Sequence, residues 1–481
     1  MKKFFVIGLL LASITTWSQN DKEPFLASQQ YYFVTARSAA MGSAFGALGG
    51  DMISASQNPA GIGVYATSEI AFSPTLSYNK TTSSFDGYGA SDFRFNFALG
   101  NIGYIVHMDL GGDIEALNLG ITYNRLNSFH QNQFIYSDKS TGSLLDEFSY
   151  YANNGLGRKT YEDLAYYTNL ILPLPSSDYY VNDFTYYNID KPYGHILERS
   201  VSKTGRIGET AISGGINVSD KMYYGLTIGI QDMYYEEITN HYENSDGASF
   251  PSDQIYFRDF SFKENLYMSG TGINFKFGSI FRPFDFLRLG VAFHTPTTMY
   301  LTGEFNTIMN ASFNNDSAMY YSSYSDVFTN DFRSVSPLKA MGSLAVLFGK
   351  VGLLSVDYEY ADYSTMMVRS NEDNFRDIQK TIKDTYKATN NVRAGLEFRD
   401  GIISYRLGAA YYESPYKNTT INTFDRIMYS GGIGFRGKVT YFDFTYALNK
   451  LKYSEYPFMD SPKATLTSNT GRFIATLGFR F

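Results

Sequence analysis

From residue 69 onward, short segments of this chain alternate apolar side chains with polar or small ones. In residues 352–360, one face of an extended strand would carry Leu354 and Tyr358, and the opposite face would carry Ser355 and Asp357. Successive side chains of a β-strand point to opposite sides, so a period of two residues indicates strands that are buried on one face. This alternation predicts an all-β protein.

Segments of this kind recur fourteen times, and fourteen is an even number, as single-chain bacterial barrels require. The expected strands are 69–80, 94–108, 116–126, 209–219, 222–235, 265–279, 284–297, 338–349, 351–362, 391–400, 402–412, 428–437, 439–449 and 470–481. In 94–108, Gly100-Asn101 resembles a hairpin turn, but glycine inside a strand often marks a bulge. We therefore expect one strand with a bulge or kink there.

The connections between these segments alternate in length. Tight turns or short loops are expected at 109–115, 219–221, 280–283, 349–350, 400–401 and 437–438, and long excursions at 127–209, 236–264, 298–337, 363–390, 413–427 and 450–469. A soluble sandwich has no reason to keep this alternation, whereas outer-membrane barrels have short periplasmic turns and long extracellular loops. The pattern predicts a 14-stranded antiparallel transmembrane β-barrel.

The N-terminus has the composition of an export signal. Lys2 and Lys3 precede an apolar run at 4–14, which is too short to span a membrane as a helix, and Ser18 follows. We expect residues 1–18 to be a signal peptide; the alternative is a buried N-terminal strand. The chain has no cysteine, which excludes disulfides and thiolate metal sites. Its net charge of -7 gives no case for nucleic acid.

Residues 36–63 consist almost wholly of Gly, Ala and Ser, with Asn58-Pro59-Ala60 near the end. Such a segment has too few large side chains to form a core of its own, but small residues allow it to pack closely inside another structure. We expect residues 19–67 to be a hatch that plugs the barrel formed by residues 68–481.

The run ARSAAMGSAFGALGGDMISASQNPAGIG followed by EIAFSPTLSY resembles the N-terminal hatch of the FadL/TodX outer-membrane transporters. The resemblance continues in 289–305, 355–366 and 391–416. It implies a 14-stranded barrel in the outer membrane of a Gram-negative bacterium, monomeric and without a cofactor. It also implies transport of long-chain fatty acids or other hydrophobic molecules, with membrane lipid as neighbour.

The same resemblance assigns roles to particular residues. It identifies Asn58, Pro59 and Ala60 as the hatch motif, preceded by Gly42, Gly46 and Asp51. It implies a lateral exit at a kinked third strand, here 116–126, where Gly120 is suited to a kink; Gly100 and Gly103 in the second strand are equally suited. From the residues alone, Asn58-Pro59 is also compatible with an ordinary turn.

Several charged residues are expected to point into the barrel. They are Arg393, Arg399, Arg406, Arg472 and Arg480, with Asp357, Glu359, Glu397 and Asp443. Such charges mostly pair across a lumen and brace the plug, whereas a carboxylate ligand would require an unpaired arginine. In the first long excursion, Tyr161, Leu164, Ala165, Thr168 and Ile171 have helical spacing, and Pro173 and Pro175 would end the helix. This helix would either cap the barrel or form an apolar landing groove.

The sequence gives little support to an enzyme. The five histidines are scattered, and neither a close-spaced metal pair, nor a Gly-x-Ser-x-Gly motif, nor a phosphate-binding glycine loop is present. We therefore expect a non-enzyme without a metal site. The rival to transport is a plugged barrel that serves as an interaction platform in protein secretion or surface assembly. Fatty acids, aromatic hydrocarbons and haem-like compounds all stay open as ligands.

Overall fold

The computed structural model describes residues 22–155, 161–175, 177–314, 320–370, 375–418 and 424–481. Within these residues, no helix has the length and apolar character needed to cross a membrane.

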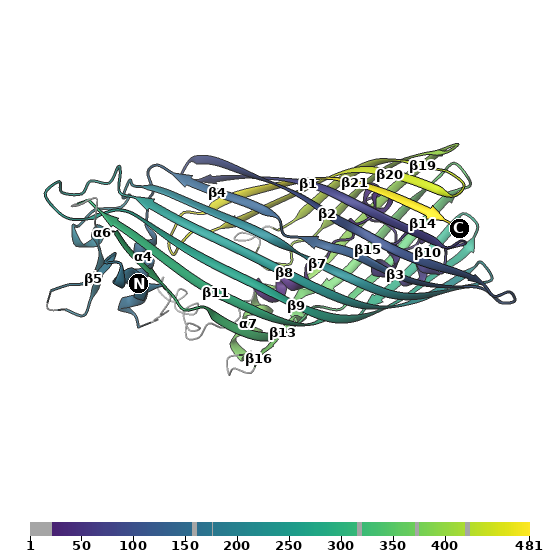
Figure 1. Ribbon diagram of the computed structural model, residues 1–481, viewed down its shortest axis with the longest axis horizontal. Coiled ribbons are helices and arrows are strands. Elements are labelled where there is room, and N and C mark those ends of the chain that lie inside the picture. Colours follow the sequence, from purple (N-terminus) through teal and green to yellow (C-terminus); the bar gives the residue numbers. More distant parts are fainter. Residues whose placement is uncertain (1–21, 156–160, 176, 315–319, 371–374, 419–423) are drawn as a thin grey trace, which may run out of the picture.

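The dominant feature is a closed antiparallel β-barrel of fourteen wall strands (Figure 1). Nine wall strands are continuous over their length: β1 (Glu69–Phe85), β2 (Tyr88–Asp109), β7 (Ile196–Val218), β8 (Met222–Asn244), β9 (Phe257–Phe284), β17 (Ala388–Asp400), β18 (Ile403–Tyr412), β19 (Arg426–Arg436) and β20 (Thr440–Glu455). The last strand, β21 (Ala464–Arg480), pairs with β1 from Glu69↔Arg480 onward and closes the barrel.

The other four wall strands are interrupted. They are β3 (Ile114–Ser128) with β4 (Gln131–Ser137); β10 (Leu287–His294) with β11 (Thr298–Phe313); β12 (Tyr320–Tyr324) and β13 (Phe328–Val335) with β14 (Lys339–Phe348); and β15 (Gly352–Asp362) with β16 (Met367–Ser370). Each of the fourteen expected segments corresponds to a different wall strand, so the predicted strand number is confirmed.

The expected bulge in the second strand is present. Ser73 pairs with Asn101 and Pro74 pairs with Leu99, which leaves Gly100 without a partner in an otherwise continuous β2. The hairpin between β1 and β2 lies instead at Asp86-Gly87, where both residues have positive φ. A type I′ hairpin turn requires that conformation at both central positions.

Three connections differ from expectation. The turn expected at 280–283 lies at 285–286, because β9 continues to Phe284. The excursions expected at 236–264 and 298–337 are largely strand, since β8, β9 and β11 extend far into them. These extensions were missed because the regular alternation of apolar and polar residues, on which the prediction rested, fades above the band described next.

An apolar band surrounds the outer wall. On β8, the outward side chains Tyr224, Leu226, Ile228 and Ile230 are each more than 40% exposed, and the equivalent positions of β9 carry Phe and Ile. Nine residues at about 3.4 Å each, tilted in a barrel wall, span roughly the 25 Å of hydrocarbon that an outer-membrane barrel crosses. With 23 and 28 residues, β8 and β9 project well beyond this band.

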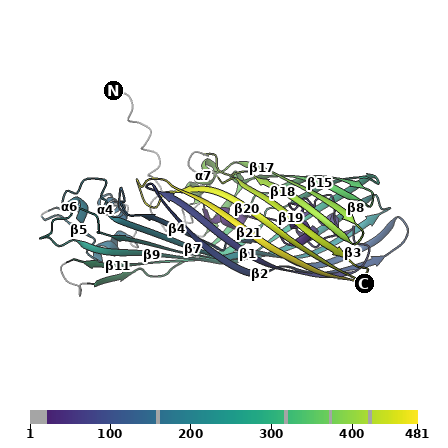
Figure 2. The ribbon, with the colours of Figure 1, turned by 90° about the horizontal axis from the view of Figure 1, so that it is seen from above.

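The projecting end of the barrel carries the long first excursion. Its elements are α4 (Leu144–Asn153), α5 (Glu162–Tyr167), α6 (Asp183–Tyr186), β5 (Ile171–Pro173) and β6 (Tyr180–Asn182). Figures 1 and 2 show them at the end opposite the C-terminus, which we call the loop end. The expected helix at 161–171 was too long, because Asn169 has a left-handed φ of 59° and Ile171 begins β5.

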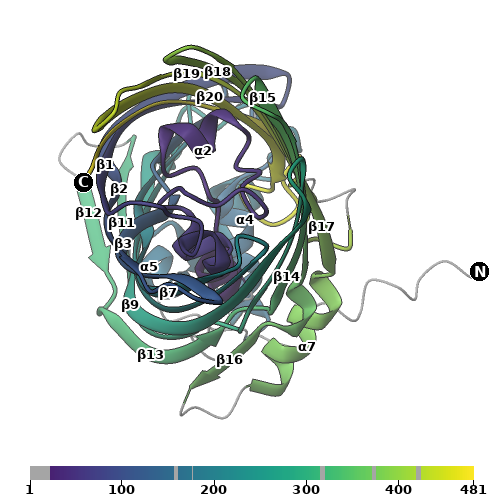
Figure 3. The same ribbon diagram turned by 90° about the vertical axis from the view of Figure 1, so that its right-hand side faces the viewer.

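The N-terminal segment, residues 22–67, lies inside the ring of strands (Figure 3). It contains α1 (Lys22–Ser28), α2 (Ala36–Ala40), α3 (Ser54–Gln57) and the 3₁₀ turn η1 (Pro59–Ile62). Its larger side chains, including Tyr32, Phe45 and Ile53, join wall residues in one hydrophobic cluster. Of the remaining elements, η2 (Tyr363–Thr365) follows β15, and α7 (Phe375–Thr385) follows β16 and packs against both β16 and η2.

Candidate functional site

The small residues of the N-terminal segment bring its backbone into contact with the barrel wall. Gly42 has a φ of 61°, and a Cβ there would lie 2.6 Å from the main-chain oxygen of Ala409 on β18. A Cβ at Gly46 would lie 2.9 Å from the Cβ of Ser343 on β14. Side chains at these positions would force the backbone away from the wall, so both glycines are needed for the observed packing.

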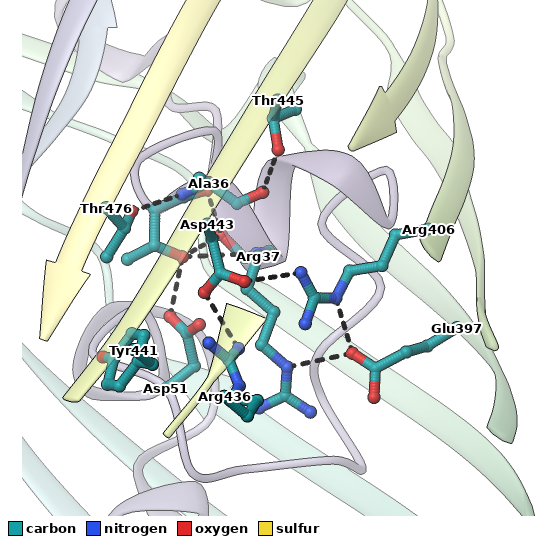
Figure 4. Close-up of polar contacts among 12 residues, drawn as sticks. Ala36, Arg37, Asp51, Glu397, Arg406, Arg436, Tyr441, Asp443, Thr445 and Thr476 are labelled. Atoms are coloured by element: carbon teal, nitrogen blue, oxygen red, sulfur yellow. Dashed lines mark hydrogen bonds and ion pairs between the residues drawn. The ribbon is translucent and has the colours of Figure 1, made fainter. Parts of the chain in front are cut away.

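Helix α2 is attached to the wall by hydrogen bonds at its first residue (Figure 4). The main-chain nitrogen of Ala36 donates to Oγ1 of Thr476 at 2.7 Å, and Oγ1 of Thr445 donates to the oxygen of Ala36 at 2.6 Å. Thr35 caps the helix and also donates from Oγ1 to Asp51 Oδ1 at 2.8 Å. These contacts satisfy backbone groups that a buried helix end would otherwise leave without partners.

An ion-pair network extends from α2 into the wall. Arg37 Nε lies 3.2 Å from Glu397 Oε2 on β17, and Arg406 on β18 contacts the same carboxylate at 2.6 Å. Arg406 also contacts Asp443 on β20 at 2.6 Å, and Arg436 contacts Asp443 at 2.8 Å. Figure 4 shows these side chains converging beside α2. Only Arg37 of this network comes from the N-terminal segment. If Arg37 moved away, Glu397 and Asp443 would each keep an arginine partner from the wall.

A second polar contact holds the turn around Gly46. The carboxylate of Asp357 on β15 accepts from the main-chain nitrogens of Phe45 and Gly46 at 3.0 Å, and from Nε2 of Gln57 at 2.9 Å. Asp357 was expected to point inward with the charges that brace the plug, but its particular partners in the N-terminal segment were not foreseen. An inward acidic position opposite a glycine-rich segment is the signal that would have found it.

Asn58 connects two parts of the N-terminal segment. Its Nδ2 donates to the oxygen of Gly46 at 2.5 Å, and its Oδ1 accepts from the nitrogen of Ala60 at 3.1 Å, which caps η1. Pro59 occupies the first position of η1, where its missing N–H costs nothing. Asn58 therefore joins the Gly46 turn to the turn that contains Pro59 and Ala60.

Four of the five expected inward arginines are paired. Arg393 contacts Glu359 at 3.0 Å, Arg399 contacts Glu397 at 2.5 Å, and Arg480 contacts Glu69 at 2.9 Å; Arg406 belongs to the network above. Arg472 on β21 has no hydrogen-bond or ion-pair partner among the described residues. Its charged neighbours there are Arg426 and Arg125, so the potential around it is positive.

The wall has a seam between the second and third strands. The ladder between β2 and β3 ends at Asn101↔Asn124. The part of β2 that precedes it, from Tyr88 to Gly100, forms a ladder only with β1 among the described residues. Beyond the break that follows Ser128, β4 lies beside this edge, and Arg94 bridges to Asn132 at 3.1 Å. We call this edge of β2 the seam.

Gly120 lies away from the seam. It pairs with Ile105 on β2 and with Ser213 on β7 in ladders that run through it without a shift. The irregularities of the third strand lie instead between Ile114 and Ala116, between Arg125 and Asn127, and at the break after Ser128. These irregularities lie on both sides of Gly120, and the kink at Gly120 stays a prediction.

A cavity of about 450 Å³ opens at the loop end. Its lining is mainly apolar and aromatic: Asn169, Leu170, Leu172, Pro173, Pro175, Val181, Asn182, Asp183, Tyr186, Tyr187, Ile255, Phe313 and Tyr321. Leu164 and Ala165 of α5 pack beneath it in the core, so this excursion both caps the barrel and forms a groove. We call this cavity the loop-end pocket.

Asp183 is the one ionisable carboxyl in the lining of the loop-end pocket, and sequence reasoning gave no signal for it. Its Oδ2 accepts from the main-chain nitrogen of Phe257 at 2.6 Å. Burial among apolar groups raises the pKa of Asp183 to about 6, an effect that the Phe257 N–H opposes only in part. The described residues contain no group of three or more potential metal ligands.

Comparison of the fold with solved structures finds a FadL homologue and toluene transporters. A FadL homologue from Pseudomonas aeruginosa aligns with a TM-score of 0.57 at 14% identity, covering 94% of this chain and 100% of that one. The toluene transporter TbuX of Ralstonia pickettii gives 0.51 at 14% identity, covering 95% and 100%. The toluene transporter TodX of Pseudomonas putida gives 0.53 at 12% identity, covering 94% and 98%.

Neither a protein-family model nor a curated protein sequence matches this chain. At 12–14% identity, the likeness to these structures is evidence for the fold alone. The chain therefore has the fold of the FadL-like outer-membrane β-barrels.

Proposed function

We propose that this protein carries hydrophobic small molecules across the outer membrane, with the N-terminal segment as a gated hatch. One observation carries the proposal: a FadL-like barrel encloses a buried segment that packs against the wall and whose polar attachments, among the described residues, are hydrogen bonds and one ion-pairing arginine, Arg37. Polar attachments of this kind can exchange for other polar contacts, so the segment can rearrange without unfolding the barrel.

Lipid-like molecules need such a path because each CH₂ exposed to water costs about 0.8 kcal/mol. We infer that ligand first enters the loop-end pocket and then passes to the lumen. There, Arg472 would receive a carboxylate, because a half-buried arginine without a carboxylate partner among the described residues gains from an anionic head group. This favours fatty acids and related acids within the wider class of hydrophobic ligands.

We further propose that ligand leaves sideways through the seam. The outward side chains of this stretch, Phe93, Phe95, Phe97 and Leu99, are 42–74% exposed and belong to the apolar band. An opening there would face lipid, not water. Between Tyr88 and Gly100, separation requires the loss of side-chain contacts such as Arg94–Asn132, not of a backbone ladder.

Uptake into cells tests the proposal. The protein is expressed in a Gram-negative host that lacks its own transporter, and entry of radiolabelled decanoate and toluene is compared with that in cells carrying the empty vector. Faster entry of at least one compound is expected. Entry equal to the vector control, with the folded barrel present in the outer membrane, would contradict the proposal and favour an interaction platform.

A further inference from the structure

The loop-end pocket combines an apolar lining with a carboxyl group and lacks a basic side chain. None of its lining residues is Lys, Arg or His, and Tyr186, Tyr187 and Tyr321 are its other ionisable groups. Lys191 and His195 follow α6 along the chain, but they pair with Asp146 and Glu243. Asp253 lies near enough to act on Tyr187, and it adds negative potential, not positive.

Asp183 has one oxygen available to a ligand. Oδ2 is occupied by the Phe257 N–H, whereas Oδ1 has no hydrogen-bond or ion-pair partner among the described residues. Oδ1 accepts a hydrogen bond when Asp183 is ionised, and the carboxyl can donate one when it is protonated. An ionised carboxylate ligand beside ionised Asp183 would bring two like charges together in apolar surroundings, which is unfavourable.

We propose that the loop-end pocket binds its ligand through a hydrogen bond to Asp183, and thereby takes uncharged head groups that carry an O–H and rejects ionised carboxylates. Alcohols and protonated carboxylic acids fit this description. For a fatty acid, the ligand and Asp183 together would hold one proton in the pocket, and the acid later ionises beside Arg472 by releasing that proton to water. The inference rests on the proposed function, because it names the head group that the first site of the transport path accepts.

The pocket can be observed separately from the lumen. The natural chain has no cysteine, so Leu172→Cys, at a half-exposed position in the pocket lining, can be labelled with an environment-sensitive fluorophore. Decanol and decanoate are titrated into the labelled, detergent-solubilised protein at pH 5.5 and pH 7.5. Decanol should bind with similar affinity at both pH values, because either protonation state of Asp183 can form the hydrogen bond.

Decanoate should bind about tenfold or more tightly at pH 5.5 than at pH 7.5, because the shared proton must be taken up at a cost that grows above a pKa of about 6. Asp183→Asn keeps an acceptor for the Phe257 N–H and can donate from its amide to a carboxylate. It should therefore raise the affinity for decanoate at pH 7.5 by about tenfold and reduce the pH dependence.

Asp190→Asn is the matched control, since Asp190 is exposed and outside the pocket lining; it should behave as the natural protein does. The inference is overturned if decanoate binds equally well at both pH values, if Asp183→Asn leaves the pH dependence unchanged, or if no ligand alters the label. None of these results affects the uptake of decanoate or toluene by cells, so the proposed function is judged independently.

Discussion

The side-chain amide of Asn58 donates to the main-chain oxygen of Gly46, twelve residues earlier in the chain, at 2.5 Å. This contact is buried and joins the turn that Asp357 holds against β15 to the turn that begins at Pro59. Gln57 Nε2 donates to the oxygen of Ser43, and the nitrogen of Gly50 donates to the oxygen of Gly61, so Asn58 is one of several links between the two halves of the segment. A change at Asn58 affects both halves.

Asn58→Ala should loosen the N-terminal segment and change uptake while leaving the barrel folded. The substitution leaves the oxygen of Gly46 and the nitrogen of Ala60 without these partners, at a cost of about 1–3 kcal/mol confined to the segment. Uptake of decanoate is measured with heat-modified electrophoretic mobility as the test of barrel folding. Unchanged uptake at equal surface expression would refute the role given to Asn58.

Arg37→Met should increase hydrogen exchange in residues 36–63 with little effect on barrel stability. Glu397 keeps Arg399 and Arg406 as partners when Arg37 is removed, so no carboxylate is left unpaired. Arg406→Met is the matched comparison, because Arg406 joins β17, β18 and β20; its loss should destabilise the barrel by about 3 kcal/mol. Equal effects of the two variants on the barrel would show that Arg37 belongs to the wall, not to a releasable attachment.

Backbone amides along the seam should exchange faster than those farther along β2. Residues from Tyr88 to Gly100 pair only with β1 among the described residues, whereas those from Asn101 to Asp109 also pair with β3. Open hydrogen-bonding edges exchange readily, and a difference of about tenfold between peptides from the two parts is expected. Uniform protection along β2, measured in lipid nanodiscs by mass spectrometry, would exclude the seam as an exit.

Arg472→Gln should lower decanoate uptake by about tenfold and leave toluene uptake unchanged, because only the acid has a charge for Arg472 to receive. Arg399→Gln is the control, since Arg399 is partly exposed and already pairs with Glu397. A parallel loss for both compounds would point to a structural role of Arg472, and no loss for either would remove it from the path.

The sequence predicted the barrel well because alternation, glycine and turn residues act locally. The bulge at Gly100 and the close packing of Gly42 and Gly46 against the wall occur at glycines because a Cβ at these positions would collide with neighbouring atoms. The attachments of Arg37 and Asp357 could not be predicted, because they depend on which wall strand meets the segment in space. Asp183 was missed for the same reason: its burial is created by β9 and the packed first excursion, not by its sequence neighbours.

The central claim is that the N-terminal segment must move for transport. Gly46→Cys combined with Ser343→Cys would bring two thiols together: a Cβ at position 46 lies 2.9 Å from the Cβ of Ser343, so the turn must move about 0.6 Å from β14 to reach the roughly 3.5 Å that a disulfide needs. The chain has no other cysteine, so this bond would specifically fix the segment to β14. Each single-cysteine variant serves as a control for the substitution alone.

Uptake of decanoate by the oxidised double variant, before and after reduction, is the most direct measurement. We predict that uptake is at least about tenfold slower in the oxidised protein than in either single variant, and that reduction restores it. Full uptake with the disulfide intact would show that ligand passes without movement of the segment around Gly46, and would contradict its role as a gate.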